Sequence, residues 1–285
     1  MNKRISPGKR RVLSYILVIV LTVICIALGT LVLPPGIDWR LTYRPASLAL
    51  MAGRSPYDAD VAPSAPFFAA PWCLIPLLPL AVLPEAVGRT ILVLVAVVAF
   101  AYSARRMGAR LPTLFAFVFS PLVVHCIRNS NIEWMAILGF VLPPQWGLLL
   151  VTIKPQIGVA VVVFWLVEAW RKGRIREVTR VFAPVSVLFL VSIALFGFWP
   201  GRLGAPMRIA QEYNTSLWPT SIPVGLALLV TSLKTRKINY AMAASPCLSP
   251  YVLLHAWAGA LLSIVTLNAE TIVAVISMWV LVIRW

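Results

Sequence analysis

The chain has 285 residues, of which 60% are hydrophobic and 12% are charged, and its mean hydropathy is +0.90. A soluble globular protein cannot cover this much apolar surface, so the composition indicates a protein whose solvent is the lipid bilayer. The net charge of +16 does not indicate a nucleic-acid partner, because the basic residues stand in short clusters between apolar runs. Such clusters are typical of cytoplasmic loops.

The first apolar run covers residues 12–33 and follows five basic residues: Lys3, Arg4, Lys9, Arg10 and Arg11. It is too long for a secretory signal peptide and has no small-residue cleavage site, so it predicts an anchor with a cytoplasmic N-terminus. Other strong apolar runs occupy 88–103, 111–127, 156–170, 182–199, 218–233, 251–266 and 271–283. Weaker or interrupted runs occupy 67–83, 132–142, 145–153 and 238–248.

The basic clusters set the expected orientation. Most Lys and Arg residues belong to the N-terminus and to three clusters within 105–110, 171–180 and 234–237. With all four clusters on the cytoplasmic side, residues 34–87 begin and end outside. The Pro-rich segment FFAAPWCLIPLLPLAVLP (67–84) is then predicted to be juxtamembrane or re-entrant, and 132–153 a short hairpin with Pro143 and Pro144 at its tip.

These expectations describe one all-α domain over residues 1–285, a multi-pass protein of the plasma (inner) membrane. We expect a bundle of about 8–11 transmembrane or re-entrant helices, with juxtamembrane helices in the first outer loop. The four cysteines stand singly and no CxxC or His/Cys cluster occurs, so neither a metal site nor a disulfide framework is predicted. No cofactor is expected, because the chain has no Gly-rich phosphate loop and no GxSxG motif.

Polar residues predicted near the outer face are the candidates for a functional site, because charges close to the hydrocarbon region are costly and usually functional. They come from five places in the sequence and are expected to converge on one outward-facing cavity. These residues are Asp38, Arg40, Arg44, Asp58, Asp60, Arg128, Asn129, Asn131, Glu133, Lys154, Gln156 and His255.

Asp38 is the principal candidate, since it follows the first run and is flanked by Trp39 and Tyr43. A carboxylate at interfacial depth can act as a general base. The alternatives are that Asp38 caps a helix or pairs with Arg40 or Arg44. Asp58 and Asp60 follow Ser55-Pro56 and are expected in a solvated turn, and PASLALMA (45–52) is predicted to form a short interfacial helix between Pro45 and Gly53.

Two further stretches carry polar side chains suited to an anionic phosphate. Arg128 and Asn131 occur in HCIRNSNIEW, and Lys154 and Gln156 occur in TIKPQIG. Lys154 could instead extend its ammonium to the lipid headgroups. His255 is either a substrate contact or a histidine whose ring is satisfied within a helix.

The order of these motifs resembles glycosyltransferase family 87, the polyprenyl-phosphate-dependent membrane mannosyltransferases of the GT-C superfamily. The resemblance covers residues 12–266 and rests on IDWRLTYRPASLALMAGRSPYD, RNSNIEW, IKPQIG and ASPCLSPYVLLHAW. It implies Asp38 as general base and, for the donor phosphate and the substrates, Tyr43, Arg44, Tyr57, Arg128, Asn131, Lys154, Gln156 and His255. FFAAPW (67–72) departs from the family in lacking a tyrosine and a double proline, and the chain is shorter than expected for the family.

The implied function is transfer of a sugar, expected to be mannose, from a polyprenyl-phosphate donor to a lipid or glycan acceptor on the outer side of the membrane. A single displacement with one aspartate base predicts inversion of configuration. Two alternatives remain open. The chain could be a non-catalytic GT-C-derived subunit or lipid-binding scaffold with a membrane-complex partner, or a transporter of small solutes or lipids.

Overall fold

The computed structural model describes the backbone of residues 7–204 and 210–284, and the side chains of its first helix from residue 20 onward. The side chains of the N-terminal basic cluster, from Lys3 to Arg11, lie outside the described residues. Within the described ranges every regular element is a helix and no strand occurs, so the expectation of an all-α protein is confirmed.

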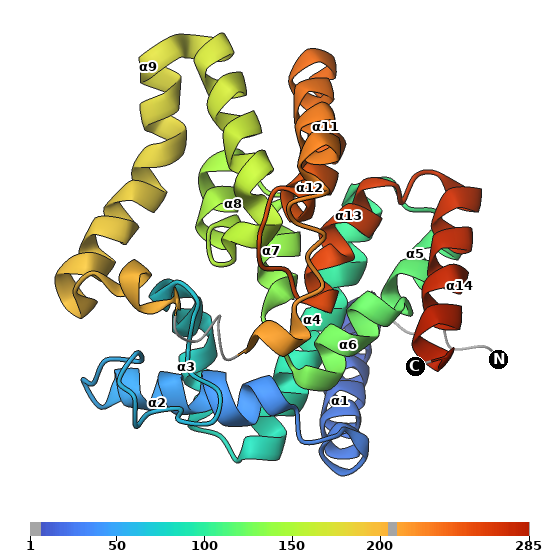
Figure 1. Ribbon diagram of the computed structural model, residues 1–285. Coiled ribbons are helices and arrows are strands. Elements are labelled where there is room, and N and C mark those ends of the chain that lie inside the picture. The colour runs from blue at the N-terminus through green and yellow to red at the C-terminus, as the bar shows by residue number, and fades with distance from the viewer. Residues whose placement is uncertain (1–6, 205–209, 285) are drawn as a thin grey trace.

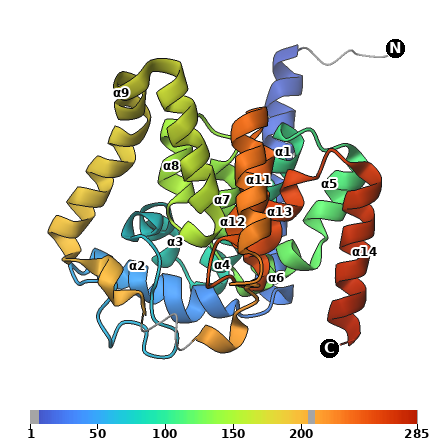
Figure 2. The same cartoon turned by 45° about the horizontal axis from the view of Figure 1, so that its top comes forward.

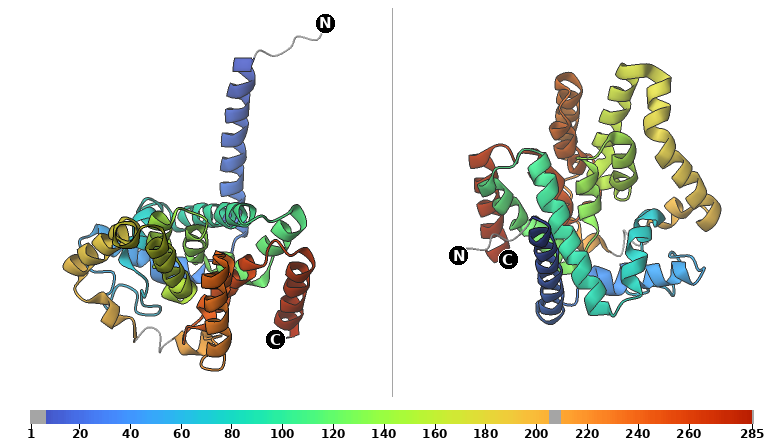
Figure 3. Two further views of the ribbon diagram at one scale, coloured as in Figure 1. Left: turned by 90° about the horizontal axis from the view of Figure 1, so that it is seen from above. Right: turned by 180° about the vertical axis from the view of Figure 1, so that it is seen from behind.

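Two helices of the described chain are long and apolar enough to cross a membrane: α4 (Glu85–Arg106) and α9 (Pro155–Phe196). A third crossing is possible if α5 (Leu111–Val118) and α6 (Pro121–Asn129), which are bent by 47°, count as one span. The first helix, α1, runs from Pro7 to Val32. Figure 3 shows α1 extending away from the other helices, and its Gly29 lies against Thr90 of α4.

The helix α9 is a hairpin of two arms. Its backbone leaves the helical region at Gly173 and at Arg174, where φ is 46°, and the second arm folds back beside the first (Figure 1). The arms carry the two apolar runs predicted at 156–170 and 182–199, and the basic cluster of residues 171–180 lies around the turn. The left-handed backbone conformation at this turn belongs to Arg174, whereas Gly173 has a φ of −159°.

The expected apolar run over 111–127 is not one continuous helix. Ser120 adopts an extended conformation (ψ 151°) before Pro121, as a residue preceding proline prefers, and its hydroxyl accepts a hydrogen bond from the Val123 N–H. The run expected over 251–266 is also interrupted. Residues 251–253 are non-helical and are followed by the short helices η5 (Leu254–Trp257) and α13 (Ala258–Ser263).

The hairpin predicted over 132–153 is present as α7 (Glu133–Gly139) and α8 (Pro144–Val151). Gly139 and Gly147 allow their backbones to approach, since a Cβ at Gly147 would lie 2.5 Å from the Gly139 carbonyl oxygen. The remaining longer helices are α11 (Ile222–Thr235), α12 (Ile238–Cys247) and α14 (Asn268–Arg284). A hydrophobic core joins α4, α7, α8, α12, α13 and the first arm of α9.

Short helices fill the segment predicted to lie outside. They are η1 (Trp39–Tyr43), α2 (Arg44–Met51), η2 (Pro71–Leu77) and α3 (Leu78–Ala81). The sequence predicts a helix over 45–52, and α2 is found within one residue of those bounds. The Pro-rich segment forms only short turns of helix, because its prolines remove the N–H donors that a long helix needs. Two further short helices, η3 (Trp199–Arg202) and η4 (Ala210–Tyr213), follow α9.

The turn of α9 and the short helix α2 lie at opposite ends of the molecule. In Figure 2 the start of α1, the turn of α9 and the end of α11 lie toward the top, whereas α2 lies at the bottom. Many large apolar side chains are exposed, among them Val187, Leu190 and Leu195 on the second arm of α9 and Val273 and Ile276 on α14. Apolar faces of this extent suit contact with lipid.

Candidate functional site

Asp38 is placed by the turn that follows α1. Gly36 adopts a positive φ of 67°, and Trp39 beyond it is fully buried, with its indole N–H donating to the Glu85 carbonyl oxygen at 3.2 Å. Asp38 precedes η1 but makes no capping hydrogen bond to it. Arg40 lies 3.9 Å from Glu85. The half-buried Asp38 carboxylate instead accepts a hydrogen bond from the Asn131 amide, with 2.6 Å between Oδ2 and Nδ2.

Asn131 is held between the end of α6 and the start of α7. Ser130 before it has a left-handed backbone (φ 54°), and the Asn131 N–H donates to the Cys126 carbonyl oxygen at 3.0 Å. Its side-chain oxygen Oδ1 accepts from Lys154 Nζ at 2.8 Å. The α7–α8 hairpin makes this contact possible, because it returns the chain to its starting point over residues 133–151. Asn131 and Lys154 were both expected near the outer face, and the structure places them in direct contact.

Lys154 forms a buried ion pair with Glu133. Both side chains are almost inaccessible, at 4% and 0% exposure. Lys154 therefore does not extend to lipid headgroups, which was one of the two expectations for it. An ion pair this deeply buried repays its desolvation only when further hydrogen bonds satisfy its members, and the hydrogen bond from Lys154 to Asn131 is of that kind.

Two histidines continue the cluster away from Lys154. His255 from η5 stacks on His125 from α6, with ring centroids 5.4 Å apart and the two Nδ1 atoms 3.2 Å apart. The other ring nitrogen of His255 lies 3.6 Å from Glu133 Oε2, and His125 is within hydrogen-bonding distance of Asn129. We call this continuous set the buried polar network; its members are Asn129, His125, His255, Glu133, Lys154, Asn131 and Asp38.

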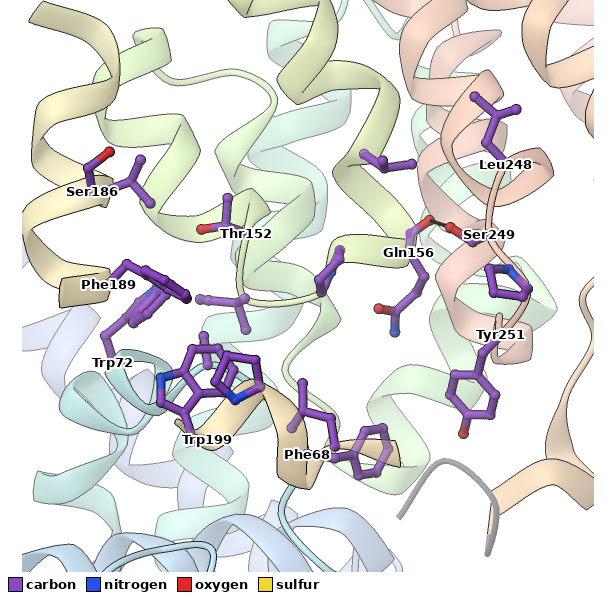
Figure 4. A pocket seen from close by; sticks show the side chains of 18 of the residues that line it. Phe68, Trp72, Thr152, Gln156, Ser186, Phe189, Trp199, Leu248, Ser249 and Tyr251 are labelled. Carbon is purple, nitrogen blue, oxygen red and sulfur yellow. Dashed lines mark hydrogen bonds between the residues drawn. The ribbon is translucent and has the colours of Figure 1, made fainter. Parts of the chain in front are cut away.

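A cavity of about 840 Å³ lies beside this network. Figure 4 shows Gln156 and Tyr251 on one side of it and Trp72, Phe189 and Trp199 on the opposite side. Apolar side chains dominate the wall, and the second arm of α9 closes it with Val185, Phe189 and Leu190. Its polar side chains are Thr152, Gln156, Ser186, Ser249 and Tyr251.

The network and the cavity meet near Tyr251. Burial, followed by the carboxylates of Glu133 and Asp38, raises the pKa of Tyr251 to about 12. Its hydroxyl is buried and has no hydrogen-bond partner within the described residues. Gln156, which stands two residues after Lys154, and Ser249 lie on the same side of the cavity as Tyr251. This side, which we call the polar end, carries hydrogen-bonding groups within reach of the charges of Glu133 and Asp38, and Thr152 and Ser186 are the polar side chains elsewhere on the wall.

The structure brings together only part of the predicted site. Asp38, Asn131, Lys154 and His255 belong to one network, and Gln156 lines the adjoining cavity. Arg128 is exposed at the end of α6, and its side chain makes no hydrogen bond or ion pair in the described part of the chain. The residues expected to converge on one cavity thus share a network in part, and of them only Gln156 is among the residues that line the cavity.

Tyr43, Tyr57 and Arg44 adjoin the site from the segment between α1 and α4. Tyr43 is buried, and burial together with the Asp38 carboxylate raises its pKa, which places it near that carboxylate. Tyr57 stacks on Trp199 of the cavity wall at a centroid distance of 5.9 Å and donates to the Ala69 carbonyl oxygen at 2.7 Å. Arg44 is half-buried, with no partner for its Nε atom among the described residues.

Asp58 and Asp60 lie apart from the network, in the turn predicted for them. Asp60 is 70% exposed and pairs with Arg54 at 2.6 Å. The hydrogen bond from Arg54 lowers the pKa of the Asp60 carboxyl. Both features fit a solvated turn that has no part in the network.

Tyr251 is the residue that the predicted site omitted. The sequence does contain a signal for it, because the tripeptide Ser-Pro-Tyr occurs twice, at 55–57 and at 249–251. Both tyrosines lie at the cavity, Tyr57 against its wall and Tyr251 in it. The repeated turn could have identified the second tyrosine.

No protein-family model, no curated protein and no solved structure matches the chain. No group of three His, Cys, Asp or Glu residues in the searched part of the chain could hold a metal ion. The site itself carries carboxylate, amide, ammonium, imidazole and phenol groups.

Proposed function

We propose that this protein is a membrane glycosyltransferase that uses a polyprenyl-phosphate sugar, with Asp38 as its general base. The observation that carries the proposal is the position of the Asp38 carboxylate. It terminates a buried polar network, lies near the polar end of an apolar cavity, and belongs to the segment that the basic clusters assign to the outer side.

The cavity suits a donor with a long apolar chain and a small polar head. Its apolar wall would take isoprenoid units of the lipid. Gln156 and Tyr251 at the polar end offer N–H and O–H donors to the sugar and the phosphate. Lys154 is neutralised by Glu133, so in this proposal the half-buried Arg44 and the exposed Arg128 remain the candidate cations for the phosphate.

The proposed reaction needs one base and no acid. Asp38 accepts the proton of an acceptor hydroxyl while that oxygen forms a bond to the anomeric carbon. The bond from this carbon to the phosphate oxygen breaks, and its electron pair leaves with the lipid phosphate, which needs no protonation. Attack opposite the leaving group inverts the configuration at the anomeric carbon. A positioned base of this kind contributes about 10²- to 10⁴-fold to the rate.

The test is transfer of radiolabelled mannose from polyprenyl-phosphate mannose by the purified full chain in liposomes, with membrane glycolipids as acceptors. Asp38→Asn should lower the rate by about 10²-fold or more. Asp60→Asn, a substitution of an exposed aspartate in the same loop, should retain the wild-type rate. Equal transfer by the wild type and Asp38→Asn would refute the role of Asp38, and absence of transfer by a folded wild type with every polyprenyl donor tried would refute the proposed activity.

A non-catalytic lipid-binding subunit is the second candidate, and the internal pairing of the network favours it. Asp38 bonds to Asn131 and Lys154 pairs with Glu133, so these groups have partners without any substrate. Native mass spectrometry of the purified chain separates the two candidates. A bound polyprenyl phosphate supports the enzyme, whereas an ordinary phospholipid in a chain without transferase activity supports the subunit.

A further inference from the structure

We infer that Asn131 is a positioning residue, locked by Lys154 and Glu133, that holds one oxygen of the Asp38 carboxylate and leaves the other to accept the proton. The role of Asp38 as the group that accepts the proton rests on the proposed function, whereas the hydrogen bonds of Asn131 do not. The inference also assigns Asn131 and Lys154 a different role from the substrate contacts expected from the sequence.

The orientation of the Asn131 amide follows from its partners. Its Oδ1 atom receives the Lys154 ammonium at 2.8 Å and the Glu133 backbone N–H at 3.2 Å. Neither group can accept a hydrogen bond, so the atom facing them has to be the amide oxygen. The Nδ2 atom therefore faces Asp38, where it lies 2.6 Å from Oδ2.

Lys154 keeps this arrangement because it cannot turn away. Its ammonium is buried, with Glu133 as its counter-ion and Asn131 as its acceptor. A phosphate that approached it would have to compete with Glu133, a carboxylate that is itself fully buried. The position suits a fixed donor within the protein.

The consequence for Asp38 is a carboxylate with two unequal oxygens. Oδ2 already accepts a hydrogen bond from the Asn131 amide, and that amide cannot itself take up a proton. A proton removed from an acceptor hydroxyl then resides on Oδ1. The hydrogen bond also fixes the side-chain rotation of Asp38, which comes from a loop that is otherwise far away in sequence, 93 residues before Asn131.

Other titratable groups surround Asp38 and enter any pH measurement on it. From its own segment Tyr43 faces it, and from the packed elements Tyr251, His125, Cys126 and His255 interact with its charge. Glu133 and Lys154 stand one contact further away, behind Asn131. The test therefore compares variants that leave all of these groups in place.

The direct test is labelling of Asp38 by dicyclohexylcarbodiimide, which reacts with protonated carboxyl groups, read by mass spectrometry of the Asp38 peptide between pH 5 and 9. Asn131→Asp keeps an oxygen for Lys154 but places a second carboxylate beside the first. The two would then share a proton, and labelling of Asp38 should persist to a pH about one unit higher than in the wild type. Asn131→Ala, which removes the donor, should shift it in the same direction.

Asn129 provides a matched control, since it lies two residues before Asn131 and its side-chain hydrogen-bond partner is His125, not Asp38. Asn129→Asp adds the same charge to the neighbourhood and should shift the labelling less than Asn131→Asp does. Equal profiles for these two aspartate variants would overturn the inference. Thermal unfolding in detergent checks that each variant is folded. If Asn131→Ala does not fold, the comparison of Asn131→Asp with the wild type still tests the inference.

Sugar transfer adds the catalytic readout. Asn131→Ala and Lys154→Met should lower kcat by about 10- to 100-fold and leave KM for the donor within about twofold. Asn131→Ala added to Asp38→Asn should cause no further loss, because the two act as a unit. A rise in KM with unchanged kcat would show that Asn131 binds the substrate, as expected from the sequence, and would contradict its positioning role. The carbodiimide experiment does not need an active enzyme, so failure of the proposed function and failure of this inference can be told apart.

Discussion

The Tyr251 hydroxyl is buried at the polar end of the cavity without a partner in the described residues. Because its pKa is raised to about 12, the phenol is neutral between pH 6 and 9, and under the proposed function it donates a hydrogen bond to the polyprenyl-phosphate sugar. We expect Tyr251→Phe to raise KM for the donor about fivefold, the loss of one neutral hydrogen bond. The pH–rate profile between pH 6 and 9 should keep its shape; a displaced limb would contradict this assignment.

The ion pair of Glu133 and Lys154 allows a second prediction at the scale of residues. Lys154→Met leaves a buried carboxylate without its counter-ion and should destabilise the protein by about 3–5 kcal/mol. Adding Glu133→Gln removes that charge and should restore part of the loss. Chemical denaturation in detergent measures both. A double variant less stable than Lys154→Met would show that the pair is not the source of the effect.

At the scale of elements, the α7–α8 hairpin depends on two glycines. A methyl group at Gly147 would meet the Gly139 carbonyl oxygen and the Trp165 ring, at 2.5 and 2.7 Å. Gly147→Ala should therefore destabilise the fold by about 1–3 kcal/mol through overpacking. Gly204→Ala is the control, since none of the described residues lies within 4 Å of its added Cβ. Thermal unfolding compares them, and equal melting temperatures would contradict close packing of the hairpin.

The elements that the sequence predicts well are those whose ends are marked by proline, glycine or basic residues. Pro45 and Gly53 bracket α2, Pro143 and Pro144 mark the tip of the α7–α8 hairpin, and basic residues mark the turn of α9. The interruption of 251–266 has no such mark within the run, because its apolar residues satisfy the composition of a span whether or not they are helical. Hydropathy alone cannot distinguish a continuous helix from short pieces packed in a core.

The sequence is limited in the same way in predicting the side-chain contacts of the candidate site. Topology placed Asn131 near Lys154, since a short hairpin joins them. It could not give the partner of the ammonium: an anionic phosphate and the lipid headgroups are the alternatives that the sequence offers for Lys154, and Glu133 is not among them. Burial and distance in the fold decide for Glu133, and they also place Asp38 against Asn131 in preference to Arg40 or Arg44.

At the scale of the whole molecule, α2 and the turn of α9 lie at opposite ends (Figure 2). We expect cysteines at Ser64 and Lys172, both exposed, to react with a membrane-impermeant maleimide from opposite sides. The measurement uses a background without the native cysteines, comparing intact cells with inverted vesicles. Position 64 should be labelled in intact cells and position 172 in inverted vesicles. Labelling of both from one side would overturn the proposed topology.

The separation of Asp38 from Asn131 along the chain has a consequence for biosynthesis. Asp38 leaves the ribosome 93 residues before the amide that holds it, an interval of about 5–20 s at ordinary rates of translation. Under the proposed topology its carboxylate spends that time in water at the membrane surface, and it is paired only after α4, α5 and α6 have taken their places. A chain that misplaces any of these helices cannot form the pair, so under the proposed function misassembled copies would be inactive as well as unstable.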